Sequence, residues 1–132
     1  MTDTASKTSI SQLGTVIVPV SDQDRARDFY VEKLGFEQRA DIPFGKDGER
    51  WLEVAPAGAR TTIALIPPRE GQPTGIDTHV AFTTTDVDAD HVSLREQGVD
   101  VDEEVMRMGG PVPPMFFFRD QDANRLLIVE QD

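Results

Sequence analysis

The stretch TVIVPVSDQDRARDFYVEKLG, residues 15–35, joins a strand-like run directly to a helix-like run. Residues 15–20 are rich in β-branched side chains, which favour a strand. Ser21 or Asp22 can then cap a helix, and Gly35 is a typical residue to end one. The stretch therefore predicts a strand followed at once by a helix.

The same pattern returns in the second half of the chain. Thr15 lies 64 positions before His79, and Gly35 lies 63 before Gly98. Three strand-like stretches follow each predicted helix, at residues 36–44, 50–56 and 60–68 in the first half and 99–108, 114–120 and 125–130 in the second. A repeat of this length indicates two copies of one supersecondary unit, each covering the open side of the other.

The repeat also fixes the expected domain organisation. One domain over residues 12–132 is predicted, made of two modules at 12–66 and 77–131. Residues 67–76 between them carry Pro, Gly and charge without an apolar period, which predicts a linker. Residues 1–11 are polar and lack periodicity, which predicts a flexible tail.

Alternation along the strands assigns their two faces. One set of positions is apolar and is expected to pack on the helices: Val16, Val18, Val20, Ile63, Leu65, Val80, Phe82, Leu126 and Ile128. The opposite set mixes polar and apolar side chains: Thr15, Ile17, Trp51, Glu53, Thr62, Ala64, His79, Ala81 and Leu127. A curved sheet covered by helices on one face leaves the other free to form a cup, and this mixture suits a ligand pocket.

Composition excludes several classes of function. The chain has 13 basic and 24 acidic residues, a net charge of −11, which disfavours binding to nucleic acid or to an anionic membrane. Such acidity favours cationic ligands, or it simply keeps the protein soluble. The sequence contains no cysteine, so it forms no disulfide and no thiolate metal site. With no early apolar run and no membrane-length segment, a cytoplasmic protein is expected.

Three stretches together resemble the vicinal oxygen chelate superfamily, which includes glyoxalase I, bleomycin-resistance proteins, fosfomycin-resistance enzymes and extradiol dioxygenases. They are VIVPVSDQDRARDFYVEKLGF (16–36), HVAFTTTDVDADHVSLREQGV (79–99) and FFFRDQDANRLLIVE (116–130). The resemblance implies an α+β fold in which two βαβββ modules form a cup-shaped mixed sheet with helices on the outer face. It also implies a homodimer.

In metal-dependent members of this superfamily, ligands come from the first and last strands of each module. The resemblance places those positions at Thr15, Ala64, His79 and Leu127, where the superfamily usually has His or Gln, Glu, His and Glu. Only His79 matches, whereas a catalytic transition metal needs about three protein ligands. We therefore expect no metal at this position and no other cofactor.

Several roles remain open for His79. It can hydrogen-bond a bound molecule, serve as a structural histidine, or transfer a proton, since imidazole titrates near neutral pH. Glu53 can reach the cup and pair with His79 in a relocated metal site. Alternatively, Glu53 is a polar group of the pocket or an ion-pair partner of Arg50.

The segment VMRMGGPVPPMFFF, residues 105–118, suggests an apolar pocket wall. Met106 and Met108 are two positions apart and share a face if the segment is a strand. The repeat aligns Phe116 with Glu53 on the cup side, which leaves Phe117 for the core. Packing in the core and at a dimer interface is the alternative interpretation of this segment.

Two classes of function remain open. The first is a glyoxalase- or bleomycin-resistance-like protein that binds a small, partly apolar molecule, with cationic molecules favoured, in a metal-free cup. The alternative is a lyase or dioxygenase-type enzyme with a relocated or incomplete metal site at His79 and Glu53; a vestigial or regulatory role is a third. The sequence identifies no catalytic residue, and the predicted ligand-binding residues are Thr15, Ile17, Trp51, Glu53, Ala64, His79, Met106, Met108, Phe116 and Leu127.

Overall fold

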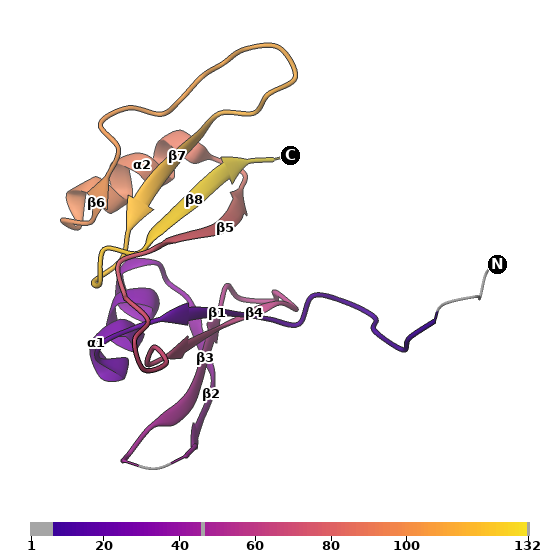
Figure 1. Ribbon diagram of the computed structural model, residues 1–132. Helices are drawn as coiled ribbons and strands as arrows, with labels where there is room; N and C mark the ends of the chain where they lie inside the picture. Colours follow the sequence, from indigo (N-terminus) through magenta and orange to yellow (C-terminus); the bar gives the residue numbers. More distant parts are fainter. Residues whose placement is uncertain (1–6, 46, 132) are drawn as a thin grey trace.

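The first half of the chain folds as strand, helix and three strands in a computed structural model, which describes residues 7–45 and 47–131 (Figure 1). Its elements are β1 (Thr15–Pro19), α1 (Gln23–Asp28), the π-helical segment η1 (Phe29–Lys33), β2 (Glu37–Pro43), β3 (Arg50–Ala55) and β4 (Thr62–Ile66). Asp22 caps α1 by accepting a hydrogen bond from the backbone N–H of Arg25 at 3.1 Å. Gly35 follows the helix with a φ of 77°, a conformation that favours glycine.

The second half repeats this order. Its elements are β5 (Asp77–Thr84), α2 (Val87–Glu96), β6 (Asp100–Val101), β7 (Met115–Arg119) and β8 (Arg125–Glu130). Asp86 caps α2 through the backbone N–H of Ala89. The predicted strand at 99–108 is largely wrong, because only Asp100–Val101 pair with β7 and Met106 forms an isolated bridge to Met115.

The strands form two four-stranded sheets, in the orders β1-β4-β3-β2 and β5-β8-β7-β6. In each sheet the first strand pairs in parallel with the last strand of its module, and the remaining pairs are antiparallel. This is the predicted α+β architecture of two βαβββ modules. Within one chain the sheets are separate, and β1 and β5 each lie at a sheet edge.

Outside these elements the described chain is irregular. Residues 67–76 and 7–14 contain no helix or strand, and residues 1–6 of the predicted tail lie outside the described residues. The segment that leads into β1 projects away from both sheets (Figure 1). None of the described helices is long and apolar enough to cross a membrane.

One apolar core joins the two modules. It contains Val18, Tyr30 and Leu65 from the first module together with Leu94, Phe118 and Leu126 from the second. The predicted helix-facing positions lie in this core or pack against it, apart from Val16, which is half-buried. Neither module buries its helix-facing side alone, so the modules fold against each other.

A polar network also crosses the junction between the modules, in the turn before β8. The buried Asp120 carboxylate accepts a hydrogen bond of 2.7 Å from the Tyr30 hydroxyl. Asn124 donates from Nδ2 to the Pro19 carbonyl and accepts at Oδ1 from the N–H groups of Gly75 and Ile76. This turn therefore ties the end of β1 and the helix of the first module to the second module.

Candidate functional site

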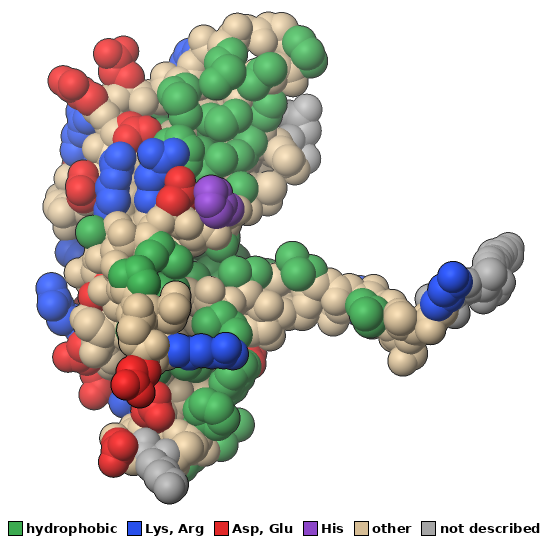
Figure 2. All heavy atoms as spheres, in the orientation of Figure 1, with side chains coloured by type: hydrophobic (Ala, Val, Ile, Leu, Met, Phe, Trp, Pro, Cys, Tyr) green, Lys and Arg blue, Asp and Glu red, His purple; other side chains and the backbone are tan. Residues whose placement is uncertain are grey.

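Each sheet has a face turned away from the helices, called here its open face. Apolar side chains gather on this side of the molecule, over both modules (Figure 2). On the first module, Ile17 is 61% exposed and Ile42 57% exposed. Such exposure of large apolar side chains, here on the two edge strands β1 and β2 of one sheet, is typical of a binding or association surface.

The first open face carries one carboxylate beside one indole. The Trp51 Nε1–H donates a hydrogen bond to Glu53 Oε2, and both side chains are half-buried. Phe44 packs edge-on against Trp51, with ring centroids 5.8 Å apart. Glu53 makes no ion pair with any residue that the structure describes, so its charge is available to a cationic ligand.

Arg50 is occupied elsewhere. Its guanidinium contacts Asp24 at 2.7 Å and Asp41 at 3.0 Å. The hydrogen bonds that Arg50 donates to Asp41 and Asp24 raise the pKa of Arg50 above its ordinary value. The alternative in which Glu53 pairs with Arg50 is therefore wrong.

The second open face combines an apolar centre with a charged edge. Phe117 pairs with Leu127 across β7 and β8, and the Arg125 guanidinium stacks on the Phe117 ring at 3.6 Å from its centroid. Arg125 Nε lies 3.5 Å from Asp77 Oδ2. A cavity of about 220 Å³ here is lined by Asp77, His79, Val80, Phe117, Arg125 and Leu127.

His79 stands in a bulge of the edge strand β5. Asp77 pairs with Arg125 and Ala81 with Leu127, so residues 78–80 of β5 lie opposite the single residue Leu126 of β8. The His79 backbone has a φ of 59°, and its side chain is 84% exposed. Its Nδ1 lies 3.8 Å from Asp77 Oδ1. The bulge thus turns the imidazole outward instead of holding it against the sheet.

The remaining predicted site residues divide into three groups. Thr15 and Ile17 lie on the first open face, where the Thr15 hydroxyl is 3.1 Å from that of Thr62. Met106 bridges to Met115 beside the second open face, while Met108 is exposed in the following loop. Ala64 is fully buried between its partners on β1 and β3, so its side chain cannot touch a ligand.

The prediction for Phe116 is wrong, and so is the core prediction for Phe117. Phe116 is fully buried on the helix side, edge-on to the His91 ring of α2 at 4.9 Å between centroids. The pairing of Phe117 with Leu127 places Phe117, not Phe116, in the row equivalent to Glu53 and Ala64. An alignment of β3 with β7 at a spacing of 64 instead of 63 would have found Phe117.

The predicted residues do not share one cavity within a single chain. The groove between the modules, about 490 Å³, includes His79 and Val80 together with Leu13 and Val16. Glu53 and Trp51 do not line it. The chain therefore presents the predicted residues on two separate open faces.

A divalent metal does not fit the positions that the superfamily uses. Ala64 and Leu127 have no donor atom, and the Thr15 hydroxyl already contacts Thr62. Over residues 7–45 and 47–131, no three His, Asp or Glu side chains come together in a group that could hold a metal ion. We therefore derive no chemistry through a metal at these positions.

The doubled βαβββ unit, with one four-stranded sheet in each half and one core shared by both, defines the class to which the protein belongs. The chain matches the Glyoxalase/Bleomycin resistance protein/Dioxygenase superfamily over residues 12–128, and it belongs to that superfamily.

Solved structures and a bacterial relative support this assignment. TnmS3, described as an antibiotic binding protein from Streptomyces sp. CB03234, is 39% identical, with 95% of this chain and 99% of that chain covered and a TM-score of 0.80. A superfamily member from Sphaerobacter thermophilus DSM 20745 is 32% identical, with coverage of 92% and 98% and a TM-score of 0.85. The uncharacterized protein YetH of Bacillus subtilis (strain 168) is 34% identical over 92% of this chain and 99% of that protein.

Proposed function

We propose that this protein binds and sequesters a small, partly apolar molecule that carries a cationic group, without using a metal. The observation that carries the proposal is the Glu53 carboxylate, which lies beside Trp51 on an exposed apolar sheet face and lacks a basic partner among the described residues. A flat cationic ligand can stack on the indole and place its charge on the carboxylate. Similarity to a protein described as antibiotic-binding supports an antibiotic-like ligand.

A second copy of the chain completes the site in this proposal. The first open face carries Glu53 and Trp51, whereas the second carries the apolar Phe117 and Leu127, with Arg125 and Arg119 paired to aspartates at its edge. The edge strands β1 and β5 also remain without a partner on one side. Two copies that pair the first sheet of one with the second sheet of the other would enclose the ligand and cover these edges.

The test uses the fluorescence of Trp51, which is the one tryptophan of the chain. A panel of cationic aromatic antibiotics is titrated beside neutral analogues of the same ring systems. We expect saturable quenching and a raised melting temperature, because a ligand that binds the folded state stabilises it. Failure of the whole panel on both readouts would contradict the proposal.

A charge-specific variant sharpens this experiment. Glu53→Gln should weaken binding of the cationic ligands about tenfold or more and leave the neutral analogues nearly unchanged, since a charged hydrogen bond contributes roughly 1.5–3 kcal/mol. Glu70→Gln, which removes the same charge from an exposed position in residues 67–76, is the matched control. Equal losses in both variants would mean that only the net charge matters.

Metal analysis separates this proposal from the enzymatic alternative. Protein purified without tag or chelator is expected to carry less than stoichiometric transition metal. Stoichiometric metal that is lost in both His79→Ala and Glu53→Gln would instead support a relocated metal site.

A further inference from the structure

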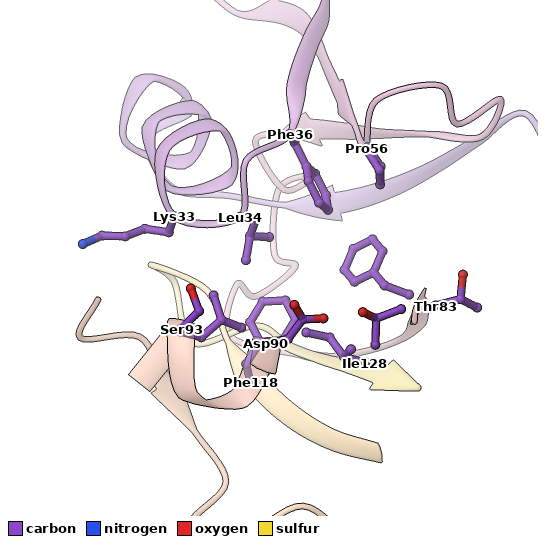
Figure 3. A pocket seen from close by; sticks show the side chains of 12 residues that line it. Lys33, Leu34, Phe36, Pro56, Thr83, Asp90, Ser93, Phe118 and Ile128 are labelled. Carbon is purple, nitrogen blue, oxygen red and sulfur yellow. The ribbon is translucent and has the colours of Figure 1, made fainter. Parts of the chain in front are cut away.

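A cavity of about 180 Å³ lies between the two modules, on the helix side of the sheets (Figure 3). In the first module its walls come from the end of η1, from Leu34 and Phe36 before β2, and from Pro56 after β3. In the second module they come from β5, α2, β7 and β8. Glu53 and Trp51 do not line it. The cavity is therefore distinct from the two open faces.

Three phenylalanines form most of its apolar wall. The rings of Phe36 and Phe82 meet edge-on at 5.3 Å between centroids, and Phe82 stacks with Phe118 at 6.3 Å. Leu34 and Leu94 extend the wall on either side of the junction. An apolar protein cavity of about 150 Å³ is known to hold benzene, so this volume suits one aromatic ring.

One carboxylate enters this apolar space without a countercharge. Asp90 is half-buried on α2, and its carboxylate points toward Phe36 (Figure 3). It makes no ion pair with the residues that the structure describes. Lys33 is turned away, with its Nζ donating to the Gln97 carbonyl at 2.8 Å.

We propose that this cavity is a second binding site, for a primary amine carried on a single aromatic ring. The ring packs among Phe36, Phe82 and Phe118, while the ammonium group binds the Asp90 carboxylate. Aromatic faces close to a cation add to the attraction. Because the ligand touches both modules, its binding holds them together and stabilises the folded state.

The experiment titrates 2-phenylethylamine into the full chain, with 2-phenylethanol as the neutral analogue of the same size. Amide NMR spectra are expected to shift at Phe36, Phe82 and Ser93, and the Trp51 indole signal is expected to stay in place. The amine should bind about tenfold more tightly than the alcohol, as a charged hydrogen bond predicts. No binding of either compound up to several millimolar, or shifts centred on Trp51, would overturn the proposal.

Two variants of α2 test the role of the carboxylate. Asp90→Asn should remove the preference for the amine and leave binding of the alcohol unchanged. Asp88→Asn is the matched control, because it removes the same charge from the same first turn at a residue paired with Arg107 outside the cavity. Equal effects of both variants would mean that the preference for the amine comes from the general acidity of the chain and not from Asp90.

A third variant tests the location. Leu34→Trp should fill the cavity and abolish binding of both compounds; if it fails to fold, the comparison of Asp90→Asn with Asp88→Asn still decides the outcome. Glu53→Gln should leave 2-phenylethylamine binding intact. Loss in Glu53→Gln would assign the amine to the open face and refute the second site, so failures of the two proposals are distinguishable.

Discussion

At the scale of single residues, Asp120 links Tyr30 of the first module to the turn before β8 in the second. Its Oδ2 accepts hydrogen bonds from the Tyr30 hydroxyl and from Asn124 Nδ2, and its Oδ1 accepts from the N–H groups of Asp122 and Asn124. Burial raises the pKa of the Asp120 carboxyl, and these hydrogen bonds oppose the rise. Burial first, and the charge of Asp120 second, hold the pKa of Tyr30 well above its ordinary range.

Tyr30→Phe should lower the free energy of unfolding by about 1–3 kcal/mol at neutral pH, because a buried carboxylate loses a donor. Since the pKa of Tyr30 is higher in the folded state, the wild-type chain keeps this contribution below about pH 10 and loses it as pH rises further. The phenylalanine variant should lack that alkaline loss. Urea denaturation between about pH 7 and 11 measures both effects, and parallel pH profiles would contradict the assignment.

From the sequence, the face on which a side chain lies could be predicted only where residues alternate regularly along a strand. Ile17, Trp51 and Glu53 were predicted on the open face and lie there, since β1 and β3 keep regular alternation. Phe116 and Phe117 were exchanged, because three consecutive aromatic residues carry no alternation of their own. The stacking of Arg125 on Phe117 had no sequence signal, as it depends on the pairing of β7 with β8.

At the scale of elements, the bulge in β5 decides where His79 can act. A non-glycine residue with φ near +60° is strained by about 1 kcal/mol or more, and such strain is concentrated at functional positions. The bulge also leaves His79 without a partner on β8. The strand thus exposes the imidazole beside Asp77 and Arg125, where it can contact a molecule on the second open face.

His79→Val should destabilise the protein by about 1–2 kcal/mol, because a β-branched side chain tolerates positive φ poorly. His79→Gly, which accepts this backbone conformation, should keep the melting temperature near that of the wild type. Both variants remove the imidazole and should weaken ligand binding alike. Thermal denaturation together with the Trp51 titration separates the two effects; equal melting temperatures for Val and Gly would argue against backbone strain at this position.

Among the element boundaries, the helix starts could be predicted from the sequence, whereas the end of the strand after the second helix could not. The first helix was predicted with Ser21 or Asp22 as its cap, and Asp22 is the residue that caps it. The repeat predicted a second helix in the other half, and Asp86 caps that helix in the same way. Of the predicted strand at 99–108, only Asp100–Val101 form a strand. The Asp102 carboxylate then accepts a hydrogen bond from the Phe117 N–H and pairs with Arg119, and the chain leaves the sheet after this residue. A local pattern cannot reveal where a neighbouring strand ends.

At the scale of the whole molecule, the exposed apolar faces favour association. Ile17 on the edge strand β1 is 61% exposed, and Phe44 and Met108 are exposed as well. A monomer with two such faces would leave long sheet edges and apolar side chains in water, which natural proteins usually avoid. These faces support the predicted homodimer, which stays a prediction, as does the predicted cytoplasmic location.

Ile17→Asp should convert the proposed dimer into a folded monomer and weaken binding of the cationic antibiotics. The side chain is exposed within one chain, so its replacement should cost that chain little stability. Val92→Asp on α2 is the matched control, because Val92 is 54% exposed on the helix side. Molar mass by light scattering distinguishes the states; a monomeric wild type, or dissociation by Val92→Asp alone, would contradict the proposed arrangement.

The common core of the two modules has a consequence for how the chain is held together. Both halves repeat one topology and bury their apolar sides only against each other, while residues 69–73 between them are exposed. The molecule is thus equivalent to a fused pair of half-length subunits, as expected from duplication of a gene whose product paired with itself. Co-expression of the halves as separate polypeptides should then restore the native assembly by fragment complementation. The covalent connection would contribute only by raising the effective concentration of one half near the other.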